Sequence, residues 1–216
     1  MKLTLYSYWR SSSAWRVRIG LHHKGLPFRY QAVNLLAGEQ FQEAHQARNP
    51  MGHVPVLEVE EDGRQARLTQ SVAILEWLEE RFPNQPLLPE DLGARARVRA
   101  IAEHVNSSIQ PYQNSKVLKW MKERAAPSED WVARFVGDGM AHLEEAVRPG
   151  AGRYCQGDAV TLADLYVVPQ LYGARRLGLD VARFPTLLRV EEACRGLEAF
   201  AKSEPSRQPD APAEAR

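Results

Sequence analysis

Alternating apolar and polar residues predict short strands in the first part of the chain. Leu3 to Tyr8 and Phe28 to Val33 both alternate in this way. Between them, Ser13 to Lys24 has the pattern of a helix, which Gly25 ends. A short polar helix is expected over residues 39–48.

The alternation continues in a predicted hairpin. Val54-Pro55 opens a third strand, Asp62-Gly63 is a strong turn signal, and residues 65–69 are expected to pair back as a fourth strand. Ser71 then caps a helix that runs to Phe82, with apolar residues spaced to share one face. This order of elements predicts a small α/β domain.

The character of the chain changes after the three prolines of residues 83–89. Residues 91–124 and 128–148 have helical periodicity and no convincing strand. The segment Thr-Leu-Ala-Asp at 161–164 looks like a capping box that opens an apolar helix. A last helix is expected from about 185 to 201. The second part of the chain is therefore predicted to be all-helical.

The proline-rich linker divides the chain into two predicted domains. Residues 1–83 form the α/β domain and residues 90–216 form the helical domain. The final dozen residues are rich in Pro, Ala, Ser and Glu. We expect them to be disordered or to lie across the surface.

Composition narrows the classes of function. Twenty-eight basic and 27 acidic residues give a formal net charge of +1, which gives no reason to expect a nucleic-acid or membrane partner. No apolar run reaches the roughly 20 residues that span a bilayer, and the N-terminus has the pattern of a strand rather than of a secretory signal. Cys155 and Cys194 form no CxxC pair, so we expect a reduced, cytoplasmic protein. No pattern predicts a metal site.

Three consecutive serines, Ser11, Ser12 and Ser13, stand at the start of the first predicted helix, directly after Arg10. Unpaired N–H groups and the helix dipole favour an anion at this end, and a thiolate held there has a lowered pKa. The plainer interpretation is that one serine caps the helix. Three serines exceed what a cap requires, so the segment is a candidate thiolate site.

Two further segments can also be interpreted either as part of a binding site or as ordinary structural features. A cis bond at Val54-Pro55 would turn the Val54 backbone outward to pair with an extended peptide, but trans is the commoner state. Gln70-Ser71, at the start of the next helix, is either a second anion site or a plain N-cap. The sequence leaves both choices open.

Taken together, these features resemble the glutathione transferase fold along nearly the whole chain. Ser11 to Ile19, Ser-Ser-Ser-Ala-Trp-Arg-Val-Arg-Ile, is similar to the zeta-class signature Ser-Ser-Cys-x-Trp-Arg-Val-Arg-Ile. Other segments similar to that class are Asn49 to Pro55, Gln70 to Glu76, Ile109 to Asn114 and Arg207 to Pro212. The resemblance implies a thioredoxin-like first domain with a mixed four-stranded sheet, followed by an all-helical domain.

The zeta class includes maleylacetoacetate isomerase and maleylpyruvate isomerase, which use glutathione as a cofactor. The resemblance implies that Ser11, Ser12 and Ser13 surround the glutathione sulfur. Residues implied to hold the rest of glutathione are Gln42, Val54, Gln70, Ser71, Gln113 and Asn114. A maleyl diacid substrate calls for arginines, because a guanidinium matches a carboxylate bidentately. Arg10 and Arg176 are the candidates.

The implied reaction is a cis–trans isomerisation by reversible addition of the glutathione thiolate. Ser13 stands where the signature has cysteine; its hydroxyl can donate to a thiolate but cannot form a mixed disulfide. The leading interpretation is maleylacetoacetate isomerase, in the breakdown of tyrosine and phenylalanine. The alternatives are maleylpyruvate isomerase of a gentisate pathway, a transferase or dehalogenase of α-halo acids, and a non-catalytic interaction module. The resemblance also implies a homodimer.

Overall fold

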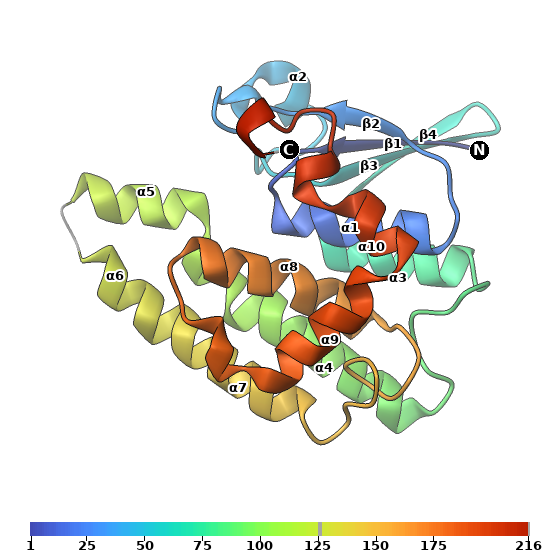
Figure 1. Cartoon of the computed structure of the whole chain (residues 1–216). Helices are drawn as coiled ribbons and strands as arrows, with labels where there is room; N and C mark the ends of the chain where they lie inside the picture. Colours follow the sequence, from blue (N-terminus) through green and yellow to red (C-terminus); the bar gives the residue numbers. More distant parts are fainter. Residues whose placement is uncertain (125–126, 216) are drawn as a thin grey trace. The chain divides into compact units, whose positions relative to one another are not determined.

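The computed structural model describes residues 1–124 and 127–215, and the chain divides into two compact units (Figure 1). The first unit comprises Met1–Gln85 together with Leu197–Arg216, and the second comprises Pro86–Gly196. The second predicted domain, 90–216, therefore includes a C-terminal segment that the structure groups with the first unit.

The first unit is built on a four-stranded sheet with the strand order β2-β1-β3-β4. β1 (Lys2–Ser7) pairs parallel with β2 (Arg29–Ala32) and antiparallel with β3 (Val56–Glu61). β3 pairs antiparallel with β4 (Arg64–Thr69). The predicted mixed four-stranded sheet is confirmed.

Two helices follow strands of this sheet. α1 (Ser12–His23) connects β1 to β2 and is buried along all of Ala14–Leu21, while α3 (Ser71–Arg81) follows β4. The helix predicted over 39–48 is instead two short pieces, η1 (Glu39–Phe41) and α2 (Glu43–Gln46). The break occurs because Gln42 is extended, with ψ of 147°.

The second unit is built from helices, as predicted. Its elements are α4 (Leu92–Ser108), η2 (Gln110–Gln113), α5 (Ser115–Glu123), α6 (Ser128–Trp131), η3 (Val132–Gly137), α7 (Asp138–Val147), α8 (Leu162–Arg176), η4 (Val181–Arg183) and α9 (Pro185–Arg195). The pattern over 91–124 predicts no break, yet α4 ends at Ser108 and Pro111 lies in the tight turn of η2. α8 is buried along most of its length and packs against α4 and α9.

The C-terminal segment differs from the prediction. α9 ends at Arg195 with Gly196 as its C-cap, so the single helix expected from 185 to 201 is two helices. The elements after Gly196 are α10 (Glu198–Ser203), η5 (Pro205–Arg207) and η6 (Ala213–Ala215). α10 packs against α1, and Pro205, Gln208 and Ala211 are buried. The tail is part of the first unit because its apolar residues complete that unit's core.

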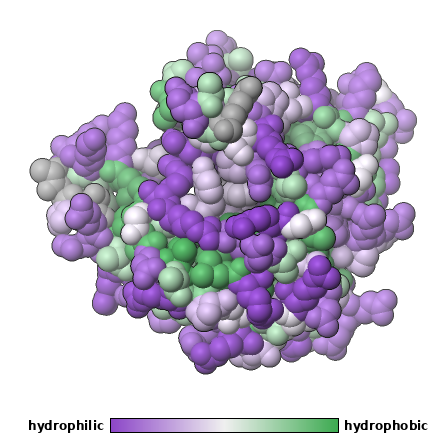
Figure 2. All heavy atoms as spheres, in the orientation of Figure 1, coloured by the Kyte–Doolittle hydropathy of each residue, from purple (hydrophilic) through white to green (hydrophobic). Residues whose placement is uncertain are grey.

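Hydrophilic side chains cover much of the face shown in Figure 2. Among the described residues, no helix is long and apolar enough to cross a membrane. Nor does that part of the chain bring three or more His, Cys, Asp or Glu residues together where they could hold a metal ion. Cys155 and Cys194 are buried thiols, and burial raises the pKa of both. Neither is suited to act as an exposed nucleophile.

Candidate active site

The register of the sheet brings segments that are distant in sequence to one edge. Tyr6 pairs with Val56, and Val56 pairs with Thr69. The end of β1, the start of β3 and the end of β4 are therefore neighbours. The residues predicted for a glutathione site that belong to the segments at this edge are Ser11, Ser12, Ser13, Val54, Gln70 and Ser71.

The start of α1 has the properties of an anion site. Ser11 is the N-cap, and its Oγ accepts from the Ala14 N–H at 3.2 Å. A hydroxyl that accepts through a lone pair still has its O–H to donate. Ser11, Ser12 and Ser13 are half-buried, and the first turn of α1 contains no acidic side chain. The positive end of the helix is therefore not neutralised locally, which suits a thiolate.

A buried arginine connects the starts of α1 and α3. Arg16 is 0% exposed, and its Nη1 donates to the Ser71 Oγ at 3.3 Å. A cation beneath Ser71 adds positive charge to the N-terminus of α3, which favours a carboxylate there. Gln70, directly before it, is exposed and has a φ of +69°. Arg16 is absent from the predicted site; the signal that could have found it is a charge inside an apolar helical run.

The Val54-Pro55 peptide bond is cis, the state that the sequence left open. The loop before it is fastened to α2 through one carbonyl. The His53 oxygen lies 3.0 Å from His45 Nε2 and accepts from Asn49 Nδ2, also at 3.0 Å. Gln42, directly before α2, is exposed. These contacts position the backbone that precedes β3.

The two arginines predicted to bind the diacid belong to different units. Arg10 is half-buried, and its guanidinium lies 5.2 Å from the centre of the Trp9 ring. Stacking of this kind orients a guanidinium while its planar edge still faces a carboxylate. Arg176, at the end of α8, is exposed and lies 6.0 Å from the Tyr172 ring.

Gln113 and Asn114 make structural contacts within the second unit. Gln113 and Gln170 exchange two amide hydrogen bonds, at 2.9 and 3.1 Å. The Asn114 Oδ1 caps α5 by accepting from the Lys116 N–H at 2.9 Å. These bonds account for both side chains without a ligand. Their contact with glutathione stays a prediction.

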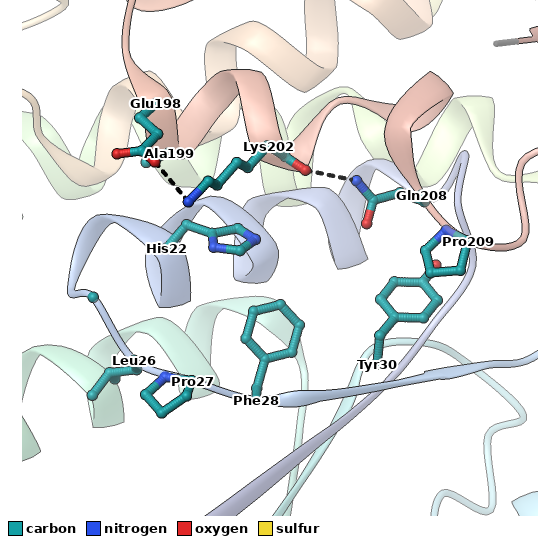
Figure 3. Close-up of a pocket in the computed structure, with 11 residues that line it drawn as sticks. His22, Leu26, Pro27, Phe28, Tyr30, Glu198, Ala199, Lys202, Gln208 and Pro209 are labelled. Carbon is teal, nitrogen blue, oxygen red and sulfur yellow. Dashed lines mark hydrogen bonds and ion pairs between the residues drawn. The ribbon is translucent and has the colours of Figure 1, made fainter.

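A pocket of about 570 Å³ lies in the first unit at the other end of α1 (Figure 3). It is lined by the last turn of α1, the start of β2 and the tail, including His22, Phe28, Tyr30 and Lys202. The serines are at the opposite end of the helix. The pocket is therefore separate from the candidate active site.

Comparison with known proteins identifies the family. The model of the glutathione S-transferase N-terminal domain matches residues 10–81. The zeta-class glutathione S-transferase of Euphorbia esula is 45% identical over 212 residues, which cover 97% of this chain and 92% of that protein. The chain belongs to the zeta class of the glutathione S-transferases.

Other relatives carry isomerase names. The crystal structure of maleylacetoacetate isomerase from Anaeromyxobacter dehalogenans 2CP-1, with glutathione bound in its active site, is 64% identical. It superposes with a TM-score of 0.92, and the match covers 98% of each chain. The maleylpyruvate isomerase of a Ralstonia species is 41% identical over 214 residues, 96% of this chain and 99% of that protein. The resemblance stated from sequence is confirmed.

Proposed function

We propose that this protein is a glutathione-dependent isomerase that converts maleylacetoacetate to fumarylacetoacetate. One observation carries the proposal: 64% identity, over 98% of both chains, to a maleylacetoacetate isomerase that binds glutathione in its active site. The start of α1 supports it independently. Half-buried hydroxyls with no acid in the first turn are what an ionised sulfur requires.

Glutathione, when bound, supplies the thiolate that adds to the cis double bond of the maleyl group and departs after rotation about that bond. Ser11 donates its O–H to the sulfur while its lone pair caps α1, and Ser12 and Ser13 add donors beside it. These hydrogen bonds and the helix dipole hold the sulfur ionised near neutral pH. The serines are therefore donors and not nucleophiles.

The remaining residues of the sheet edge hold the peptide part of glutathione. The Val54 backbone pairs with the cysteinyl unit as an added strand would. Gln70 and Ser71 bind the γ-glutamyl end, where the buried Arg16 guanidinium supplies charge behind the Ser71 hydroxyl. Gln42 reaches the glycyl end. Gln113 and Asn114 are weaker candidates, because their side chains already have partners.

Arg10 and Arg176 bind the carboxylates of the diacid. Bidentate pairing of a guanidinium with a carboxylate fixes orientation as well as charge. Arg10 immediately precedes the serines, so a carboxylate bound there lies beside the sulfur site. Holding one end of the substrate still allows the other end to rotate when the double bond is temporarily single.

Maleylpyruvate is the second candidate substrate. The Ralstonia maleylpyruvate isomerase matches nearly the whole chain at 41% identity, and Ser13 replaces the cysteine of the signature. A hydroxyl at this position serves either diacid. The preference between maleylacetoacetate and maleylpyruvate depends on how residues of the second unit bind the part in which the two substrates differ.

We further propose a role in tyrosine and phenylalanine breakdown, a cytoplasmic location and a homodimer whose contacts come from residues 71–82, which include α3, and from residues 91–124, which include α4 and α5. The supporting observations are the similarity to a maleylacetoacetate isomerase and the fact that Cys155 and Cys194 form no disulfide. Analytical ultracentrifugation tests the dimer. A sedimentation coefficient of the monomer at micromolar concentration would contradict it.

The activity is tested by assaying maleylacetoacetate and maleylpyruvate side by side, with and without glutathione. The proposal expects faster turnover of maleylacetoacetate and dependence on glutathione. Faster turnover of maleylpyruvate would favour the second candidate. Equal rates without glutathione would refute the mechanism, and failure to bind glutathione at all would favour a non-catalytic module.

A further inference from the structure

The C-terminal tail is fastened to the unit that contains the serines. Arg18 of α1 donates to the Ser203 carbonyl through Nε at 3.2 Å and through Nη2 at 3.0 Å. The Gln208 amide donates to the Lys202 carbonyl at 3.0 Å (Figure 3). It also donates to the Glu204 carbonyl at 2.8 Å, and the two bonds fold the chain back on itself. The tail thereby reaches β2 and the loop after β1.

Asp210 of this tail contacts the backbone just before the serines. Its Oδ2 accepts from the Trp9 N–H at 2.9 Å, and its Oδ1 accepts from the Tyr30 O–H at 2.7 Å. The two oxygens therefore have different partners, one in the loop and one in β2. Figure 3 shows the Tyr30 ring beside Pro209, the residue before Asp210. The contact with Trp9 spans 201 positions of the sequence.

Arg18 holds the same loop from within the core. Its Nη2 donates to the Trp9 carbonyl at 3.0 Å, and its Nη1 donates to the Tyr8 carbonyl at 3.4 Å and to the Ser7 Oγ at 3.1 Å. The side chain is 0% exposed. Burial lowers the pKa of Arg18 to about 10, against the opposing effect of Tyr30 and Asp210. The guanidinium is therefore still charged at neutral pH.

The N–H and the C=O of Trp9 are thus both bound by charged side chains. Hydrogen bonds of this kind are stronger than those between neutral groups. Trp9 is one residue before Arg10 and two before Ser11. We call Arg18 and Asp210 together the Trp9 clamp. Because the loop between β1 and α1 is short, the clamp fixes the positions of the backbone of Arg10 and Ser11.

We propose that the Trp9 clamp is a positioning device for the reaction, and that Asp210 and Arg18 act on catalysis through Trp9. This inference rests on the proposed function, because it assigns the clamp to the thiolate site of that reaction. A displacement of about 1 Å in a group that contacts the reacting atoms is enough to lower a rate by about 100-fold. The C-terminal tail would then be a functional part of the first unit.

The test compares Asp210→Asn with Glu214→Gln, a control that removes an exposed acid four residues further along the same tail. The amide nitrogen of asparagine cannot accept from the Tyr30 O–H, and its oxygen has no negative charge, so the Trp9 N–H loses its charged acceptor. Three quantities are measured: hydrogen exchange of the Trp9 amide, the pKa of bound glutathione by thiolate absorbance, and kcat with KM.

The clamp predicts that Asp210→Asn exchanges the Trp9 amide about tenfold faster. It also predicts a raised thiol pKa and a kcat lowered about tenfold, with little change in the KM of the diacid. Glu214→Gln should match the wild type in all three. Tyr30→Phe, which leaves the Trp9 bond in place, should produce a smaller effect than Asp210→Asn.

Two outcomes would overturn the inference. The first is exchange at Trp9 that is as slow in Asp210→Asn as in the wild type. The second is faster exchange with an unchanged thiol pKa and kcat, which would make the clamp purely structural. If Asp210→Asn unfolds, Tyr30→Phe supplies the same measurements in a milder form. An inactive wild type with a normal thiol pKa would refute the proposed function, and exchange at Trp9 would still decide whether the clamp holds the loop.

Discussion

The starts of α1 and α8 use the same type of cap in opposite ways. Ser11 caps α1 with a neutral, half-buried hydroxyl, and no acid lies in the first turn. α8 has a buried capping box, in which Asp164 Oδ2 accepts from the Thr161 N–H at 2.7 Å and O–H at 3.0 Å. Asp164 Oδ1 accepts from the Cys155 N–H at 2.8 Å. We call the start of α8 the closed start, because its own Asp164 carboxylate lies there. We call the start of α1 the open start, because no acidic side chain lies in its first turn.

The difference is electrostatic as well as geometric. A carboxylate at the start of α8 neutralises the positive end of that helix. Burial raises the pKa of Asp164, and the hydrogen bonds from Cys155 and Thr161 oppose that rise. At α1, hydroxyls satisfy N–H groups without adding negative charge. An anion from outside can therefore bind at α1, whereas α8 has no comparable place for one.

The largest expected change is a loss of stability at the closed start, the N-terminus of α8. Asp164→Ala removes the acceptor of three buried donors and should lower the free energy of unfolding by about 3 kcal/mol. Urea unfolding measures it. Asp91→Ala is the matched control, because Asp91 caps α4 at an exposed position and should cost about 1 kcal/mol. Equal losses in the two variants would contradict the role of burial.

The open start should respond in activity more than in stability. Ser11→Ala removes a donor to the thiolate, so the pKa of bound glutathione should rise and kcat/KM should fall about tenfold, or about 1.4 kcal/mol. Loss of the cap should cost about 1 kcal/mol of stability. A pH–rate profile shows the shift directly. An unchanged profile together with lower stability would mean that Ser11 is only a cap.

A neighbouring pair of arginines at the end of α8 extends the comparison. Arg176→Ala should raise the KM of the diacid about fivefold, or about 1 kcal/mol, if it binds a carboxylate. Arg175→Ala is the control: Arg175 Nη1 donates to Glu191 Oε1 at 2.6 Å, and Arg175 Nη2 donates to Glu191 Oε2. That variant should lose stability and keep its KM. A KM change in Arg175→Ala and none in Arg176→Ala would reverse the assignment.

The sequence predicts the open and closed starts unequally well. Thr161 and Asp164 are three residues apart, so a local pattern predicts their contact. The grouping of Ser11, Val54 and Ser71 depends on strand register, which no local pattern gives; only the resemblance to the zeta class implies that the three residues share a site. The contact of Asp210 with Trp9 has no local signal, because it joins the two ends of the chain. For the same reason the sequence predicts only that the final dozen residues are disordered or lie across the surface.

The smallest expected effect is a pH dependence of stability at the C-terminal end of α1. His22 lies in the last turn, where a helix dipole favours a charged imidazole. Its pKa is nevertheless lowered from 6.5, first by burial and then by the charges of Lys202 and Arg18, with Glu198 opposing them. The unfolded chain therefore binds a proton more readily than the folded protein, so stability is kept above pH 6.5 and lost as the pH falls below it.

His22→Gln should remove this part of the acid sensitivity. Urea unfolding of the variant and of the wild type at pH 7.5 and pH 5.5 measures the change, with both expected to lose some stability because burial also lowers the pKa of His23 and His104. The variant should lose less than the wild type between the two conditions. A variant that loses more stability than the wild type between the two conditions would show that the helix dipole outweighs burial and Lys202 at this end. The far end of α1 would then favour a cation, as the open start favours an anion.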